Sequence, residues 1–270
     1  MKRTLSYGIG EVRGYINWLY FYHAWGVLKA PAGERERLRA EAEERLDTYQ
    51  GRYRTHGVFG LFNANSDGDD LLIGGVRIPM LRQQSPDKET GFCLCLADFV
   101  RPMGTVADKA GAFATSADAA IAADNAGDDY ERMMSQTLSD RLAEATAERL
   151  HKDVRTTYWG YAPDENLSVE DLFNEKYQGI RPAVGYPSLP DTGANFLLDA
   201  LLGFSSVGIS LTETGMMQPH ASVSGFMFSH PKARYFHLGK IGRDQLEDYA
   251  RRRGMTVAMA AKFLQSNIQP

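Results

Sequence analysis

The sequence RPAVGYPSLP at residues 181–190 concentrates three prolines, a glycine, an arginine and a tyrosine in ten positions. Because proline lacks an amide donor and fixes φ, this stretch is incompatible with an interior strand or the middle of a helix. It predicts a stiff, extended loop whose backbone groups bond to another part of the chain. Gly185 permits the close approach of another backbone or of a ligand.

The side chains of this loop suit a small ligand that carries a carboxylate and a ring. Arg181 offers a planar fork for a carboxylate or phosphate. Tyr186 offers a flat apolar face with a polar tip. Composition leaves a second interpretation open, in which the loop is a connector and both side chains pack locally.

The composition of the chain is that of a globular protein. Of its 270 residues, 43% are hydrophobic and 24% charged, and the net charge is −4, which allows one large domain or two small ones. The net charge and the alternation of arginine with glutamate over residues 34–54 argue against a nucleic-acid surface. No apolar run is long enough to span a membrane. The two cysteines, Cys93 and Cys95, are too close for an ordinary disulfide, so we expect buried thiols and a cytoplasmic protein.

Periodicity and turn signals predict an α+β fold. Helices are expected at residues 34–49, 128–154, 168–177, 195–202, 243–253 and 257–264. Strands are expected at residues 57–65 and 71–76, which form a hairpin, and at 91–100, 111–115, 207–212, 222–228 and 235–241. The apolar segment 91–100 predicts a buried central strand, and the last three strands predict an antiparallel meander. Strand groups without regular βαβ alternation indicate an antiparallel sheet.

Familiar catalytic and metal-binding motifs are absent from the sequence. It contains no serine elbow, no His-Glu-x-x-His and no phosphate-binding loop. Its six histidines have no metal-ligand spacing. We therefore expect no metal site and no catalytic acid, base or nucleophile.

A series of further motifs carries a resemblance over nearly the whole chain. Besides RPAVGYP at 181–187, these are GLF (60–62), LRQQ (81–84), CLADFV (95–100), DRLAE (140–144), YWGYAP (158–163), LTE (211–213), ASVSG (221–225), FSHP (228–231), RDQ (243–245) and DYARR (248–252). In this order they resemble the activation domain of cobalamin-dependent methionine synthase. The resemblance implies a twisted antiparallel sheet with flanking helices. It also implies a single domain over residues 1–270, without homocysteine-, folate- or cobalamin-binding modules.

The resemblance further implies a function in methionine biosynthesis. Such a domain binds S-adenosylmethionine and supports the reductive methylation of inactive cob(II)alamin, as part of a methyltransferase. The cobalamin is held by a partner module or another corrinoid protein, and a flavodoxin-like protein donates the electron. We expect this chain to act as an excised domain or a separate subunit, whose contribution is to position the methyl group.

The resemblance assigns ligand contacts residue by residue. Arg181 would hold the ligand's carboxylate, and the main chain of Ala183 and Tyr186 would contact the ligand across the loop. Tyr235 and Phe236 stand where the family has two tyrosines, so one hydroxyl is missing.

Asn17 stands where the family has an aspartate that bonds the ligand's amino group, and its neutral amide makes a weaker bond than a carboxylate. Glu144 and Glu175 match carboxylates near the sulfonium, whose charge they would offset. The alternative for each glutamate is an ordinary surface residue.

Two other functions stay open at this stage. In the first, the chain is a non-catalytic docking protein of the same fold with weakened S-adenosylmethionine binding, as Asn17 and Phe236 suggest. In the second, it is an independent methyltransferase that acts on a small acceptor without a corrinoid.

Overall fold

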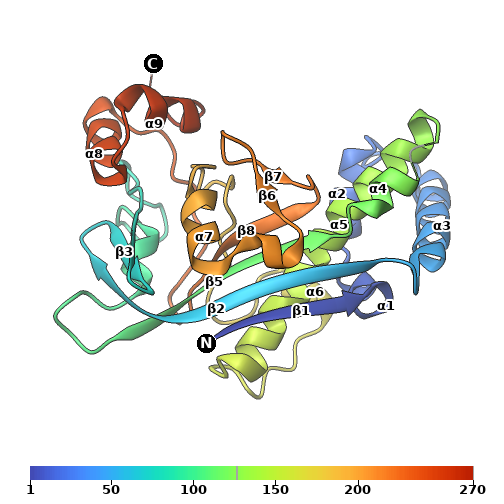
Figure 1. Cartoon of the computed structure of the whole chain (residues 1–270), viewed down its shortest axis with the longest axis horizontal. Coiled ribbons are helices and arrows are strands. Elements are labelled where there is room, and N and C mark those ends of the chain that lie inside the picture. Colours follow the sequence, from blue (N-terminus) through green and yellow to red (C-terminus); the bar gives the residue numbers. More distant parts are fainter. Residues whose placement is uncertain (126, 270) are drawn as a thin grey trace.

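An antiparallel sheet forms the centre of the computed structural model, which describes residues 1–125 and 127–269. The strand order is β4-β3-β2-β5-β8, and β1 pairs with the free edge of β2. The strands are β1 (Lys2–Gly8), β2 (Arg54–Asp67), β3 (Asp70–Ile73), β4 (Val76–Pro79), β5 (Asp108–Ala117) and β8 (Ser222–Met227). The long strand β2 runs along the molecule and joins its two ends (Figure 1). The predicted α+β class with an antiparallel sheet is confirmed.

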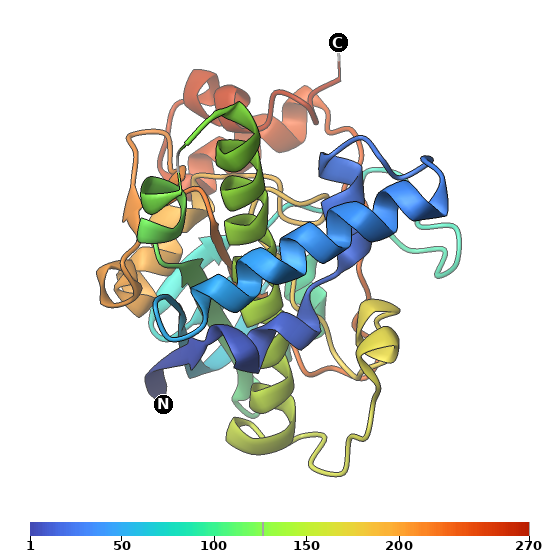
Figure 2. The same cartoon turned by 90° about the vertical axis from the view of Figure 1, so that its right-hand side faces the viewer.

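Helices cover the sheet and its ends. They are α1 (Ile9–Val12), α2 (Trp18–Ala24), α3 (Ala32–Tyr49), α4 (Ala120–Asp124), α5 (Asp129–Asp153), α6 (Val169–Phe173), α7 (Ala194–Leu202), α8 (Arg243–Arg253) and α9 (Val257–Phe263). Helices α2 to α5 lie toward one end of the long axis, and α8 and α9 lie at the other (Figure 1). Seen from the end at which α2 to α5 lie, α3 crosses in front of α5 (Figure 2). No helix of the described residues is both long and apolar enough to cross a membrane.

Two hydrophobic cores lie on opposite faces of the sheet. Alternate strand residues point to opposite faces, so Phe59 and Phe113 pack with the α5 side chains Leu138 and Leu142. Their neighbours along the strands, such as Val58, pack with α7 on the other face. The sheet therefore holds α5 in a fixed position, and α5 forms one wall of the site described below.

The local signals for α5 and α8 agree with the structure. The side chain of Asp128 accepts a hydrogen bond from the Glu131 amide and caps α5, as short polar residues do at helix starts. Gly254 ends α8 with φ at 69°, a left-handed conformation that favours glycine.

Three predicted strands are wrong or much shorter. Residues 91–100 contain no strand but a 3₁₀ turn at Leu96–Phe99, capped by Asp98, whose Oδ2 accepts from the Cys95 amide at 2.9 Å. Residues 235–241 are irregular. The strand in 207–212 is only the two-residue β6 (Ser210–Leu211), which pairs with β7 (Met217–Gln218) apart from the main sheet. The predicted meander is therefore also wrong, because β8 pairs with β5. Both cysteines are free, but Cys93 is only half-buried.

The proline-rich loop lies along the edge of β8, as its composition predicts. The amide of Phe226 donates to the Pro182 carbonyl at 3.1 Å, and the amide of Val184 donates to the Ser224 carbonyl at 2.9 Å. Gly225 makes this approach possible, because a Cβ at this position would lie 2.1 Å from the Pro182 carbonyl oxygen. At Gly185, by contrast, the glycine serves a turn: φ is 87°, and its missing Cβ faces open space.

Candidate functional site

One cavity collects side chains from five segments of the chain. Its volume is about 660 Å³, within the range of about 300–1,000 Å³ typical of small-molecule sites. Its walls are the start of α2, one face of α5, the segment around α6, the 181–188 loop and residues 235–237. All eight residues that the sequence marks as ligand contacts line it: Asn17, Glu144, Glu175, Arg181, Ala183, Tyr186, Tyr235 and Phe236.

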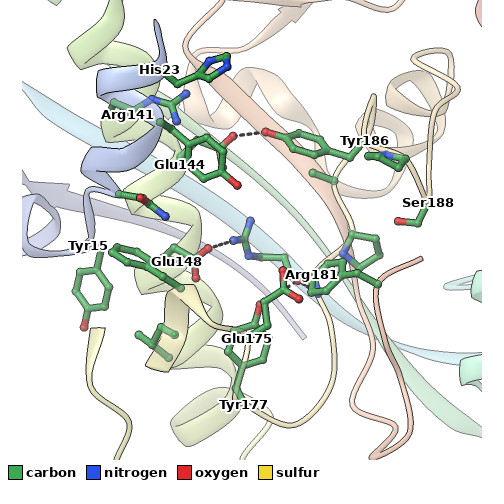
Figure 3. Close-up of a pocket in the computed structure, with 18 of the residues that line it drawn as sticks. Tyr15, His23, Arg141, Glu144, Glu148, Glu175, Tyr177, Arg181, Tyr186 and Ser188 are labelled. Carbon is green, nitrogen blue, oxygen red and sulfur yellow. Dashed lines mark hydrogen bonds and ion pairs between the residues drawn. The ribbon is translucent and has the colours of Figure 1, made fainter. Parts of the chain in front are cut away.

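Helix α5 presents three charged side chains to this cavity. Arg141, Glu144 and Glu148 are spaced by three and four residues, which places them on one helix face. Glu144 accepts a hydrogen bond from the Tyr186 hydroxyl at 2.7 Å, and Glu148 forms an ion pair with Arg181 (Figure 3). Helix α5 thus contacts both Arg181 and Tyr186 of the loop.

Arg181 is a buried charged residue that has an unused hydrogen-bond donor. The residue is 8% exposed, and its Nη2 donates to Glu148 Oε1. Within the described part of the chain, Arg181 Nε and Glu148 Oε2 are buried and have no hydrogen-bond partner. Buried polar atoms are rarely left unpaired in folded proteins. A ligand with one acceptor and one donor would satisfy both.

A pair of tyrosines fixes the backbone of the loop at Arg181. The Arg181 amide donates to the Tyr235 hydroxyl at 2.9 Å, and the hydroxyls of Tyr235 and Tyr177 are 3.0 Å apart. Burial raises the pKa of both tyrosines, so both hydroxyls stay protonated and can act as donors. Tyr235 therefore has a structural contact as well as a place in the cavity wall.

A second buried ion pair, Arg155–Glu165, packs against Tyr177. Arg155 lies 4.3 Å from the Tyr177 ring centroid and bonds to both carboxylate oxygens of Glu165 at 2.7 Å. His151 packs edge-on against Tyr177. Its pKa is far below the usual value because it is buried and because Arg155 and Arg181 are close. The imidazole is therefore neutral at physiological pH.

Glu175 occupies the rim of the cavity in a strained conformation. Its φ is 56°, and it is the one non-glycine residue with positive φ among those the structure describes. Such strain is costly and tends to occur at functional sites. Partial desolvation raises the pKa of the Glu175 carboxyl, the charge of Glu148 raises it further, and Arg181 opposes both. A bound cation would favour the ionised form.

Asn17 caps α2 and also lines the cavity. Its Oδ1 accepts a hydrogen bond from the Leu19 amide at 3.1 Å, so part of its acceptor capacity serves the fold. Phe236 is 5% exposed and contributes an apolar ring to the wall.

Sequence reasoning missed several cavity residues, above all Glu148. The available signal was helical spacing, because Glu148 follows Glu144 by four residues and must share its face. Tyr15, Tyr20, His23 and Tyr177 also line the cavity and were unmarked. No group of residues in the described ranges could hold a metal ion.

Two comparisons place this architecture among known proteins. The profile of the family described as "Vitamin B12 dependent methionine synthase, activation domain" matches residues 8–254. The fold is also similar to the crystal structure of a MetH reactivation domain bound to AdoHcy, with a TM-score of 0.92 and 40% identity. That match covers 100% of this chain and 91% of the other. The chain therefore belongs to the family of activation domains of vitamin B12-dependent methionine synthase.

Proposed function

We propose that this chain binds S-adenosylmethionine in the cavity and supports the reductive methylation of cob(II)alamin in methionine biosynthesis. The observation that carries this function is the buried Arg181 in a cavity of suitable size, with an Nε that has no partner among the residues the structure describes. A guanidinium in such a place suits a carboxylate. The similar reactivation domain is bound to AdoHcy, which is S-adenosylmethionine without its methyl group.

The loop and the 235–236 segment receive separate roles in this proposal. Arg181 binds the ligand's carboxylate through its free donor, and the main chain of Ala183 and Tyr186 contacts the ligand from the loop. Tyr235 and Phe236 form part of the cavity wall. None of these residues is a catalytic acid, base or nucleophile; their contribution is orientation of the methyl group.

The charges of the cavity favour a cationic ligand. Glu144 and Glu175 supply negative charge where a sulfonium would lie, and attraction between opposite charges grows as water is excluded. Tyr186 holds the Glu144 carboxylate in place by a 2.7 Å hydrogen bond. S-adenosylhomocysteine has a neutral sulfur and would gain less from these carboxylates.

Cobalamin belongs to a partner in this proposal. A bound S-adenosylmethionine supplies the methyl group to the reduced cobalamin of the partner. The carbon–sulfur bond breaks with its electron pair left on sulfur, so that S-adenosylhomocysteine remains. The partner is the cobalamin-binding module of methionine synthase or another corrinoid protein, and a flavodoxin-like donor reduces the cobalt. We propose that residues 1–270 form one domain that acts in the cytoplasm, either within a methionine synthase or as a separate subunit.

A reconstitution experiment tests this function. The chain is mixed with a methionine synthase fragment that carries cob(II)alamin but has no activation domain, together with reduced flavodoxin and S-adenosylmethionine. Absorbance then follows the formation of methylcobalamin. We expect formation to require the chain; an equal rate without it would contradict the proposal.

The docking function remains the second candidate because of Asn17. Its Oδ1 already caps α2, and it brings no negative charge to a ligand's ammonium group. A docking protein would bind the corrinoid fragment in the same mixture without promoting methylation.

A further inference from the structure

Glu148 neutralises Arg181 in the ligand-free cavity. The side chains of Arg181 and Glu148 are 7% and 19% exposed and form a direct ion pair. Figure 3 shows them facing each other, with Glu148 on α5 and Arg181 on the loop. A buried guanidinium requires such a counter-ion. The pair therefore carries no net charge before a ligand enters.

The cavity as a whole has more negative than positive groups. Its lining includes the carboxylates of Glu144, Glu148 and Glu175 and the guanidiniums of Arg141 and Arg181. A ligand that brought only a carboxylate would add to this excess and would repel Glu148 beside Arg181. A ligand with an adjacent ammonium group would cancel that repulsion.

One unpaired acceptor in this pair is suited to the ammonium group. Glu148 Oε2 is buried and has no partner among the residues that the structure describes, and the same is true of Arg181 Nε. The two free atoms are an acceptor and a donor at one ion pair. They match the two ends of an amino-acid zwitterion.

We propose that Glu148 is a specificity residue, whose free oxygen accepts a hydrogen bond from the ligand's α-ammonium group while Arg181 binds the α-carboxylate. This inference rests on the proposed function. It names the α-ammonium group as the part of the ligand that the site recognises besides the carboxylate. Glu148 supplies the negative charge that is missing at Asn17. A ligand with the amino group gains this charge-assisted hydrogen bond and a ligand without it does not, so the site discriminates against ligands that lack the amino group.

The test compares two ligands in two proteins. The ligands are S-adenosylhomocysteine and its desamino analogue, which keeps the carboxylate and the nucleoside. Both have a neutral sulfur, so Glu144 and Glu175 do not distinguish them. Titration calorimetry of the unaltered chain is expected to show the analogue binding roughly tenfold to hundredfold more weakly, as expected for loss of a charge-assisted hydrogen bond. The affinity ratio is the affinity for S-adenosylhomocysteine divided by the affinity for its desamino analogue. In Glu148→Gln, this affinity ratio is expected to fall to a few-fold.

The ratio separates a contact with the ligand from a merely structural role. If Glu148 only holds Arg181 in place, Glu148→Gln weakens both ligands equally and leaves the ratio unchanged; that result would overturn the inference alone. Absence of binding by the unaltered chain would overturn the proposed function together with this inference.

Two more variants complete the experiment. Glu148→Asp keeps the charge beside Arg181 but withdraws the oxygens by one methylene, so it covers the case in which Glu148→Gln does not fold. It is also expected to lower the ratio, and an unaltered ratio would contradict the contact. Asp140→Asn is the matched control on the same helix, since Asp140 pairs with His220 and lies outside the cavity. It is expected to keep the full ratio.

Discussion

Replacing Gly225 by alanine tests whether contact with β8 positions the 181–190 loop, which we propose binds the ligand. The new Cβ would lie 2.1 Å from the Pro182 carbonyl oxygen and 2.9 Å from the Ala183 Cα. Carbon and oxygen ordinarily stay about 3.3 Å apart, so the loop must move away from the strand by about 1 Å.

The energetic cost follows from the contacts that this movement breaks. The two hydrogen bonds between the loop and β8, at 3.1 and 2.9 Å, contribute about 1 kcal/mol each, and overpacking adds about 1–2 kcal/mol. The free energy of unfolding should therefore fall by about 3 kcal/mol, and Tm by on the order of 5–10 °C. Arg181 moves with the loop, so affinity for S-adenosylmethionine should fall at least tenfold.

Thermal unfolding followed by circular dichroism and titration calorimetry measure the two effects. Gly33→Ala is the matched control, because Gly33 lies in α3 and a Cβ there meets nothing within 4 Å. It should raise stability by up to about 1 kcal/mol and leave affinity unchanged. An unchanged Tm and affinity in Gly225→Ala would refute the reasoning.

Three other substitutions test particular groups. Glu175→Gln should reduce the preference for S-adenosylmethionine over S-adenosylhomocysteine at neutral pH. In the unaltered chain the same preference should shrink as pH falls from neutral toward about 4.3, because the Glu175 carboxyl, whose pKa is raised, becomes neutral. Calorimetry across this pH range measures the preference. A constant preference would contradict the proposed contact of Glu175 with the sulfonium. Glu165→Gln leaves the buried Arg155 without its charged partner and should lower the free energy of unfolding in urea by about 3 kcal/mol; a loss under about 1 kcal/mol would show that the pair matters little. Asn17→Asp keeps the cap of α2 and adds the missing charge, so affinity for S-adenosylmethionine should rise about fivefold, and no change would remove Asn17 from the contacts.

The elements that sequence predicted well are those with local causes. Helix α8 begins and ends where expected because Gly254 provides a left-handed stop. The 181–190 loop was recognised because proline restricts the backbone wherever it occurs. In both cases the deciding interaction lies within a few residues of the chain.

The errors arose where distant contacts decide the structure. Residues 91–100 are apolar enough for a strand, but Arg82 bonds to both oxygens of Asp98 at 2.7 and 2.8 Å and to the Cys93 carbonyl. These hydrogen bonds of Arg82 hold residues 93–98 in a turn conformation. Residues 235–241 lack a neighbouring strand, and the Leu238 amide bonds to Pro187 instead. The importance of Glu148 was likewise invisible, because its partner Arg181 is 33 positions away.

Binding of S-adenosylmethionine to the unaltered chain and to Arg181→Lys is the most direct test of the central claim. Lysine keeps a positive charge for Glu148, so the fold is retained, but it lacks the planar fork that suits a carboxylate. Calorimetry should show saturable one-site binding to the unaltered chain and affinity weaker by about tenfold to hundredfold in the variant. Equal affinity in both proteins, or no binding to the unaltered chain, would contradict the account.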